Sequence, residues 1–248
     1  MKRVIIVTGG ASGIGREAAI KLAHQDVSVV VADINMELAE EVVVEIKKAK
    51  KEAVAYHLDV SKKENIQAVI DFTVEKYGTL TGMFNNAGIG ALAPFPELSS
   101  EEYDRMMRIN LDGVFYGIQY AGNKMMELGV KEGSIVNTAS IYGFVGAGTS
   151  PHYNAAKAAV VSLTKSAAQA YTPHGIRVTG IAPGFTDTPM VRGALDAETL
   201  KFLEGAHMRN KLLSASEVAN VAVWLLGPES SAVNGSTVLA DDGYLAFK

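Results

Sequence analysis

Three tyrosines in the chain are each followed four residues later by a lysine. The pairs are Tyr120 with Lys124, Tyr153 with Lys157, and Tyr244 with Lys248. A phenol with its ordinary pKa of about 10 is a poor base at neutral pH, but a neighbouring ammonium group favours the phenolate. At ~4 Å and an effective dielectric constant of ~20 the attraction is about 4 kcal/mol, which lowers the tyrosine pKa by roughly 3 as an upper figure. Such a pair is suited to proton transfer, although the same spacing also places two solvated side chains on one helix face.

The composition argues against several functional classes. The 248 residues carry a net charge of −4. The chain therefore lacks the excess of basic residues that would indicate nucleic acid or an anionic membrane as a partner. Cysteine is absent, which removes disulfides, thiol nucleophiles and thiolate metal sites and suits a reducing compartment. The start MKRVIIVTGG has too short an apolar run for a signal peptide, and no segment approaches a transmembrane span. We therefore expect a soluble, cytoplasmic protein.

Short runs rich in β-branched residues alternate with longer amphipathic segments along the whole chain. The runs predict strands at 3–9, 27–33, 53–59, 80–88, 133–140, 176–184 and 236–243. The segments between them predict helices at 15–25, 35–51, 61–77, 151–173 and 214–227, and one helix followed by a longer one within 99–128. Ser61 is the predicted cap of its helix, with Glu64 at the capping-box position. This alternation indicates one α/β domain over 1–248, a doubly wound parallel sheet of about seven strands with helices on both faces.

A glycine-rich turn, TGGASGIG from Thr8 to Gly15, follows the first predicted strand and leads into a helix. Its glycines at 9, 13 and 15 let the backbone turn sharply and approach a ligand where a Cβ would collide. The helix start beyond them presents free N–H groups and a partial positive charge, which suit a pyrophosphate. An ordinary glycine-rich loop is the alternative, but the position at the first strand–helix turn of a parallel sheet favours dinucleotide binding.

Asp33 ends the second predicted strand, 18 residues after Gly15. A carboxylate at this distance accepts hydrogen bonds from the adenosine ribose hydroxyls and repels a 2′-phosphate. No Arg or Lys follows in DINME, the loop position before Gly13 is Ser12, and Arg16 is the one nearby cation that we identify. The sequence therefore predicts NAD rather than NADP, with a plain strand-end acid as the alternative for Asp33.

The three Tyr–Lys pairs differ in their expected distance from the carboxyl edge of the sheet, where ligands bind in folds of this kind. The first pair lies well along a helix, and the last lies behind Gly243, where we expect no room for a helix. Tyr153 and Lys157 fall in the first turns of a helix, and the preceding strand ends at Ser140. Only this pair is predicted to meet a serine on the ligand side.

These motifs together resemble the short-chain dehydrogenase/reductase family over essentially the whole chain. The matching segments are TGGASGIG, NNAG at 85–88, Asn110 in NLDG, Ser140 with YNAAK, and PGFTDTP at 183–189. The resemblance implies a Rossmann-type fold and an enzyme that transfers hydride between a nicotinamide cofactor and a secondary alcohol or ketone. It implies that Tyr153 transfers the proton, Lys157 supports Tyr153 and binds the ribose, Ser140 binds the substrate oxygen, and Asn110 holds a water that feeds protons to Lys157.

The resemblance also implies a set of cofactor contacts and a substrate wall. The cofactor residues beyond Tyr153 and Lys157 are Gly9, Ser12, Gly13, Ile14, Gly15, Asp33, Ile34, Asp59, Val60, Asn86, Ala87, Gly88, Pro183, Gly184, Thr186 and Thr188. Besides Ser140 and Tyr153, the predicted substrate wall contains Ala91, Phe95, Ile141, Phe144 and Met190, together with Leu195 and Phe202 of a lid at about 188–210. This wall suggests a small, mostly uncharged substrate. Asn85 and Asn86 are expected chiefly to tie strands together.

Two other functions remain open at this point. A 3-oxoacyl-carrier-protein reductase would normally use NADP(H) and a basic docking surface, and a non-catalytic NAD sensor would have little need of four catalytic residues. No metal is predicted, because the five histidines are scattered and His152 is expected to pack against a loop. Family members usually pair two long helices, here about 110–128 and 151–173, so we expect a homotetramer or a homodimer.

Overall fold

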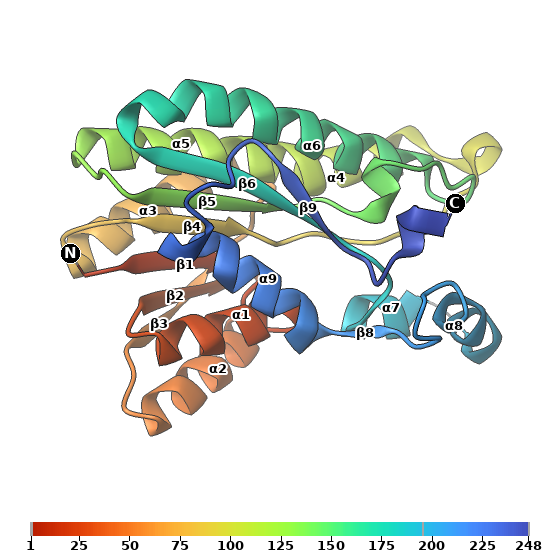
Figure 1. Cartoon of the computed structure of the whole chain (residues 1–248), viewed down its shortest axis with the longest axis horizontal. Helices are drawn as coiled ribbons and strands as arrows, with labels where there is room; N and C mark the ends of the chain where they lie inside the picture. The colour runs from red at the N-terminus through yellow and green to blue at the C-terminus, as the bar shows by residue number, and fades with distance from the viewer. Residues whose placement is uncertain (1, 195, 248) are drawn as a thin grey trace.

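A computed structural model describes residues 2–194 and 196–247. Its main feature is a sheet of seven parallel strands in the order β3-β2-β1-β4-β5-β6-β9 (Figure 1). The strands are β1 (Val4–Thr8), β2 (Ser28–Asp33), β3 (Ala53–His57), β4 (Gly82–Asn85), β5 (Gly133–Thr138), β6 (Ile176–Pro183) and β9 (Thr237–Ala240). The predicted doubly wound sheet of about seven strands is confirmed.

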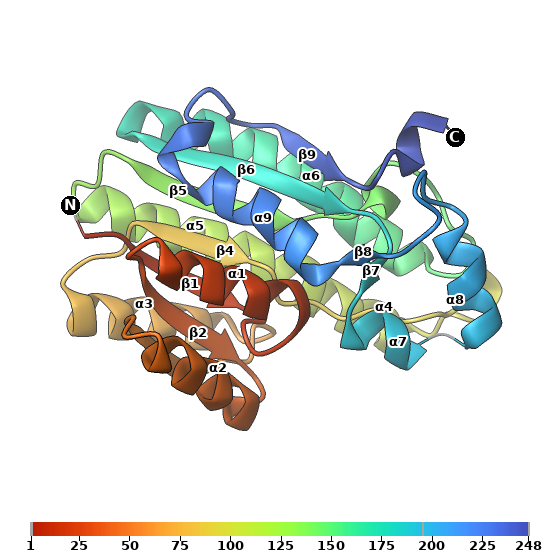
Figure 2. The same cartoon turned by 60° about the horizontal axis from the view of Figure 1, so that its bottom comes forward.

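Helices cover both faces of the sheet (Figures 1 and 2). One layer contains α1 (Gly13–His24), α2 (Met36–Lys48) and α9 (Ala215–Leu226), and the other contains α3 (Lys63–Tyr77), α5 (Gly113–Glu127) and α6 (Pro151–Tyr171). Every residue of β1 is buried, as a strand between two helical layers requires. Each face has its own apolar core, and burial of these side chains is the main term that stabilises the fold.

The order in which the chain adds strands to the sheet reverses after β3. From β1 the chain builds β2 and β3 on one side, and it then returns to place β4 against the other side of β1. Crevices form at the carboxyl ends of strands where the order reverses in this way. The termini of β1 and β4 are therefore the expected floor of a binding site.

The caps of two helices agree with their sequence signatures, and a third does not. Ser214 and Glu217 form a capping box at α9, with the Ser-x-x-Glu spacing typical of a helix start. Ser99 and Glu102 form another at α4 (Ser100–Met107). The prediction that Ser61 caps α3 is wrong: α3 begins after Lys62 without a side-chain cap, because the Ser61 hydroxyl donates to Asp59 Oδ1 at 2.6 Å instead.

The two helices expected within 99–128 are joined by a π-helical turn, Arg108–Asp112, between α4 and α5. Its wider pairing joins the Gly113 N–H to the Arg108 carbonyl. Turns of this kind are uncommon and frequently accompany functional sites. Asn110, which is completely buried, lies at its centre.

The segment after β6 forms elements that the sequence pattern did not predict. They are α7 (Pro189–Ala194), α8 (Ala197–Glu204) and a two-stranded sheet of β7 (Thr186–Asp187) and β8 (Leu213–Ser214). They lie at the carboxyl end of the main sheet (Figure 2). Two-residue strands are too short to leave a periodic pattern. A short 3₁₀ helix at Tyr244–Phe247 also forms where we expected none.

Among the helices of the described ranges, none combines the length and the apolar character needed to cross a membrane.

Candidate active site

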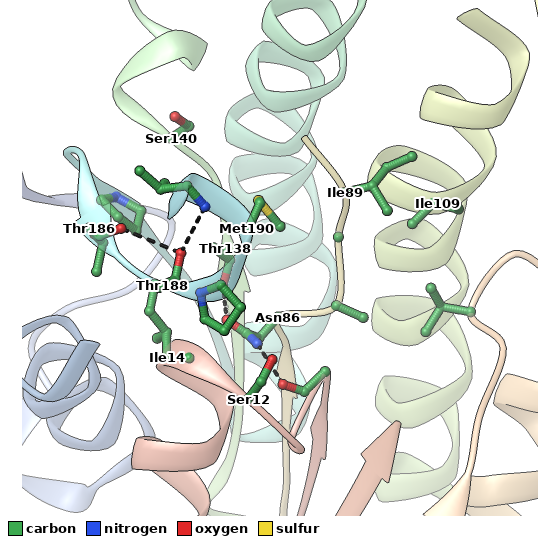
Figure 3. A pocket seen from close by; sticks show the side chains of 18 of the residues that line it. Ser12, Ile14, Asn86, Ile89, Ile109, Thr138, Ser140, Thr186, Thr188 and Met190 are labelled. Atoms are coloured by element: carbon green, nitrogen blue, oxygen red, sulfur yellow. Dashed lines mark hydrogen bonds between the residues drawn. The ribbon is translucent and has the colours of Figure 1, made fainter. Parts of the chain in front are cut away.

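A cavity of about 420 Å³ opens at the carboxyl ends of the central strands. Of the predicted site residues it is lined by Gly9, Ser12, Gly13, Ile14, Asp33, Ile34, Asp59, Val60, Asn86, Ala87, Gly88, Ser140, Tyr153, Lys157, Pro183, Gly184, Thr186, Thr188 and Met190. Figure 3 shows the glycine-turn residues Ser12 and Ile14 on one side and Thr186, Thr188 and Met190 above them. The folded chain thus gathers into one cavity residues that are up to 182 positions apart, from Gly9 to Val191.

The glycine turn has the geometry that a bound pyrophosphate needs. Gly9 and Gly13 have φ angles of +63° and +51°, which side-chain-bearing residues rarely adopt. A Cβ on Gly15 would lie 2.0 Å from the Gly9 carbonyl oxygen, so Gly15, which does not line the cavity, lets the turn close on itself. Ser12 makes no side-chain cap bond to α1, which leaves the first N–H groups of the helix for a ligand. The turn therefore fits a dinucleotide phosphate.

Two acids, Asp33 and Asp59, line the cavity where β2 and β3 end. The Asp33 carboxylate accepts from the Ala11 N–H at 3.0 Å and from the Asn35 N–H at 2.9 Å, which fixes its orientation. Asp59 accepts from Ser61, and this hydrogen bond is the main cause that holds the Asp59 pKa below its usual value. Both side chains carry oxygens that can accept hydrogen bonds from hydroxyl groups.

The cation expected near Asp33, Arg16, is engaged by other acids. Arg16 is paired with Glu17 at 3.0 Å and with Glu45, and it does not line the cavity. Arg105 of α4 does line the cavity. Arg105 is four residues from Ile109, which also lines the cavity (Figure 3), and this helical spacing places both on one face.

The asparagines of NNAG tie strand ends together, as expected. Asn85 Nδ2 donates to Asn137 Oδ1 at 2.9 Å and links β4 to β5 inside the protein. Asn86 Nδ2 donates to the carbonyls of Thr8 and Gly9, and Asn86 Oδ1 accepts from Thr138. Asn86 thereby holds the glycine turn against β4 and β5 and also lines the cavity.

Tyr153 and Lys157 project from the first turns of α6 into this cavity beside Ser140. The Lys157 side chain is only 3% exposed, its Nζ donates to the Thr138 carbonyl at 2.7 Å, and the same Nζ lies 5.6 Å from the centre of the Tyr153 ring. The amine therefore faces the phenol and the cavity, as the sequence interpretation requires. Ser140 Oγ accepts from the Tyr142 N–H at 3.2 Å, which orients the hydroxyl.

Burial dominates the electrostatics of this pair. Desolvation lowers the Lys157 pKa from 10.5 to about 8. Desolvation also raises the pKa of Tyr153, opposed by a hydrogen bond with Ser140, and Lys157 is not among the causes of the change. In the protein alone the phenol is thus less acidic than usual, and the expected lowering by Lys157 is not seen. The physical reason is that burial removes water from the phenol, and this penalty on the phenolate exceeds the effect of the hydrogen bond with Ser140.

Asn110 is anchored rather than free. Its Oδ1 accepts from the Ile89 N–H and its Nδ2 donates to the Ile89 carbonyl, both at 2.8 Å. A Cβ on Gly88 would lie 3.0 Å from Asn110 Oδ1 and 3.8 Å from Lys157 Nζ, so the three residues are neighbours. Asn110 does not line the cavity, and its side chain holds the segment after NNAG in place beside Lys157.

The two other Tyr–Lys pairs have different surroundings. Lys124 is paired with Glu127 at 2.9 Å and with Asp71 at 3.6 Å, and neither it nor Tyr120 lines the cavity. Lys248 lies outside the described residues. Tyr244 lies at the ligand edge of the sheet, 5.5 Å from the ring of Phe185.

The predicted substrate wall is only partly at the cavity. Met190 lines it and packs against Gly90, whereas Ile141 is buried and Phe95, Phe144 and Phe202 are exposed. Ala91, Phe95, Ile141 and Phe144 do not line the cavity, and Leu195 lies outside the described residues.

Next to Tyr153 lies an aromatic cluster that the sequence analysis did not predict. Its members are Tyr142, Phe185, His207 and Tyr244. The ring of Tyr142 meets the ring of Tyr153 edge-on at 6.4 Å. The one sequence signal for this cluster was the position of two members: Phe185 lies inside PGFTDTP, and Tyr142 lies two residues after Ser140.

The fold and site together define an oxidoreductase of the nicotinamide-dependent class, and the comparisons identify the family. A family model described as enoyl-(acyl carrier protein) reductase matches residues 9–245. A cyclohexanol dehydrogenase of Acinetobacter sp. strain SE19 is 40% identical, with 98% of this chain and 94% of the relative covered. The chain belongs to the short-chain dehydrogenase/reductase family, whose members use a nicotinamide cofactor.

Two further matches span nearly the full length. A 2,5-dichloro-2,5-cyclohexadiene-1,4-diol dehydrogenase of Sphingobium indicum is 41% identical, with 99% of this chain and 98% of the relative covered. The crystal structure of levodione reductase has a TM-score of 0.95 at 35% identity and covers 99% of this chain and 98% of its own.

Over residues 2–194 and 196–247, no group of three or more His, Cys, Asp or Glu side chains is placed to hold a metal ion.

Proposed function

We propose that the protein is an NAD(H)-dependent oxidoreductase that interconverts a small cyclic secondary alcohol and its ketone. The observation that carries the proposal is the meeting of Ser140, Tyr153 and Lys157 in the cavity that also holds the glycine turn and Asp33. The names of the relatives, a cyclohexanol dehydrogenase, a cyclohexadiene-diol dehydrogenase and a levodione reductase, support a ring-shaped substrate.

The roles of the chain's own residues follow from their positions. Ser140 and Tyr153 hold the substrate oxygen, and the Tyr153 hydroxyl exchanges a proton with it. Lys157, with a pKa of about 8, gains and loses a proton close to neutral pH and can therefore restore the proton of Tyr153. Asn110 keeps the segment from Gly88 to Ile89 in position beside the amine. The nicotinamide of bound NAD(H) supplies the hydride acceptor or donor.

Asp33 supports NAD as the cofactor. Its carboxylate is fixed by two backbone N–H groups, and Arg16 is neutralised by Glu17 and Glu45. A 2′-phosphate at this end would meet the Asp33 charge. We infer that the repulsion by Asp33 decides the preference, since Asp33 is the acid aimed at the ribose position.

The description of the matching family model keeps an acyl-carrier substrate as a second candidate. The net charge of −4 disfavours docking of an acidic carrier protein. Turnover of an acyl thioester faster than that of a cyclic ketone would favour the second candidate.

Replacement of Tyr153 by Phe tests the mechanism. The variant should bind NADH as the wild type does and lose at least about a hundredfold in kcat with cyclohexanol, because the proton donor is gone. Tyr120→Phe is the matched control, since this tyrosine also precedes a lysine by four residues but lies away from the cavity. Full activity in Tyr153→Phe would rule out the mechanism.

We also propose a homotetramer or homodimer built through α5 and α6, supported by Phe115, which is 40% exposed on α5. A monomeric mass in light scattering at micromolar concentration would contradict this.

A further inference from the structure

His207 is a buried histidine that the mechanism above does not use. Its side chain is 3% exposed, and it belongs to the segment that follows α8. Its Nε2 accepts from the Phe185 N–H at 3.2 Å, and its Nδ1 lies 3.0 Å from the Lys211 carbonyl oxygen. Because a carbonyl can only accept and a backbone N–H can only donate, the two contacts assign the neutral ring with its hydrogen on Nδ1.

The backbone around Phe185 is shaped to receive this ring. A Cβ on Gly184 would lie 2.6 Å from His207 Nε2, so only a glycine at this position lets the ring reach the Phe185 N–H. The Phe185 carbonyl accepts from the Leu213 N–H at 3.0 Å. His207 therefore supplies the partner of the Phe185 N–H and, with Leu213, fixes the backbone of this residue on both sides.

Phe185 lies at the centre of the segment that covers the cavity. Pro183, Gly184, Thr186 and Thr188 on either side of it all line the cavity, and Thr186 and Thr188 stand above the glycine turn (Figure 3). A Cβ on Gly13 would lie 3.2 Å from the Thr188 side chain, so the segment rests on the turn itself. A shift of the Phe185 backbone therefore changes the space left for the cofactor.

The ring of Phe185 continues the same chain of contacts toward Tyr153. It meets the ring of His207 at 5.7 Å and the ring of Tyr142 at 5.9 Å, and Tyr142 in turn meets Tyr153 at 6.4 Å. Edge-on aromatic pairs at these distances are favourable and prefer defined orientations. His207 is thus linked to the cover of the cavity through its backbone bond and to the proton-transferring ring through two aromatic neighbours.

We propose that His207 is a positioning residue of the active site, which holds the Phe185 N–H through Nε2 and thereby sets both the cofactor cover and the placement of Tyr153. The proposal rests on the proposed function, since it concerns the same reaction. The hydrogen bond at Nε2 is responsible for the effect on catalysis and cofactor binding, whereas the Nδ1 contact with Lys211 stabilises only the local fold.

Two amide variants separate the contacts. The carbonyl oxygen of His207→Gln reaches the position of Nε2 and can accept from Phe185, whereas the amide of His207→Asn reaches only the position of Nδ1 and can donate to Lys211. We expect His207→Gln to keep kcat and the KM for NAD⁺ within about threefold of the wild type. We expect His207→Asn to lower kcat/KM for NAD⁺ by about tenfold or more, which is the effect of one lost buried hydrogen bond. The loss should appear as a lower kcat and a higher KM.

Further measurements keep the test decisive. Unfolding midpoints of both variants and the equilibrium binding of NADH are measured beside the kinetics. Gly184→Ala keeps the histidine in the sequence, but the added Cβ would displace its ring from the Phe185 N–H. This variant should reproduce the kinetic loss even if His207→Asn does not fold. Equal kinetics in the Asn and Gln variants, or wild-type kinetics in Gly184→Ala, would overturn the proposal. If Tyr153→Phe kept its activity, the proposed function would fail instead, so the two failures are distinct.

Discussion

Lys157 gives the sharpest physical test of the site, because the protein buries a cation that it does not neutralise. The side chain is 3% exposed and donates to the Thr138 carbonyl, and within the described ranges no carboxylate forms an ion pair with it. Its pKa falls from 10.5 to about 8. A decrease of about 2.5 corresponds to about 3 kcal/mol of unfavourable free energy for holding the charge in the folded state at pH 7.

Lys157→Met should therefore make the protein more stable and inactive. The change removes the penalty of about 3 kcal/mol but leaves the Thr138 carbonyl without its donor, at about 1 kcal/mol, so the expected net gain at pH 7 is about 2 kcal/mol. The sign of the pH dependence follows from proton binding. Between the folded pKa of about 8 and the unfolded pKa of 10.5 the unfolded chain binds more protons, so the wild type gains stability as pH rises. The advantage of the variant should shrink by about 1 kcal/mol between pH 7 and pH 9.

Urea unfolding followed by circular dichroism at fixed protein concentration measures both quantities. Lys165→Met is the matched control, because Lys165 lies on the same helix α6 and is exposed. The control should change the free energy of unfolding by less than about 0.5 kcal/mol at either pH. A Lys157→Met protein less stable than the control at pH 7, or an advantage that does not decrease toward pH 9, would refute the burial argument.

Three further outcomes are expected. Asp33→Asn should raise the ratio of kcat/KM for NADP⁺ over NAD⁺ by about tenfold or more, because the charge opposing a 2′-phosphate is removed; a wild-type preference for NADP⁺ above about tenfold would show the assignment to be wrong. Gly117→Ala should lower the urea midpoint strongly, since a Cβ there would lie 2.1 Å from Asn85 Oδ1, and an unchanged midpoint would contradict that packing. Ser99→Ala should cost about 1 kcal/mol through the lost capping box of α4, whereas Ser100→Ala serves as its control and should cost less.

The order of strands and helices could be read from the sequence with few errors. Buried strands such as VIIVT of β1 are apolar in all but their last residue, and Ser214 and Glu217 mark the start of α9. These signals are local, because they arise from backbone propensities and from the repeat of each element. The prediction of a cap at Ser61 was wrong because the Ser61 hydroxyl has two possible partners, the helix N–H groups and Asp59. Only the folded loop shows that it bonds to Asp59.

The types and spacing of the proposed catalytic residues could also be read from the sequence. Motif positions led to Ser140, Tyr153 and Lys157, and the structure brings all three to one cavity. The substrate wall could not be found in this way. The cluster of Tyr142, Phe185, His207 and Tyr244 is assembled from four separate segments, and no periodic pattern connects them.

What the sequence determined by itself is the alternation of elements, the glycine turn and the chemical groups available for proton transfer. The tertiary structure decided how deeply Lys157 is buried, and it reversed the expected direction of the Tyr153 pKa. The reason is that a pKa and a binding surface depend on how much water packing removes, and desolvation is set by segments distant in the chain. Burial of Lys157 under Thr138, and of His207 against Phe185, exists only once the sheet and its cover have closed.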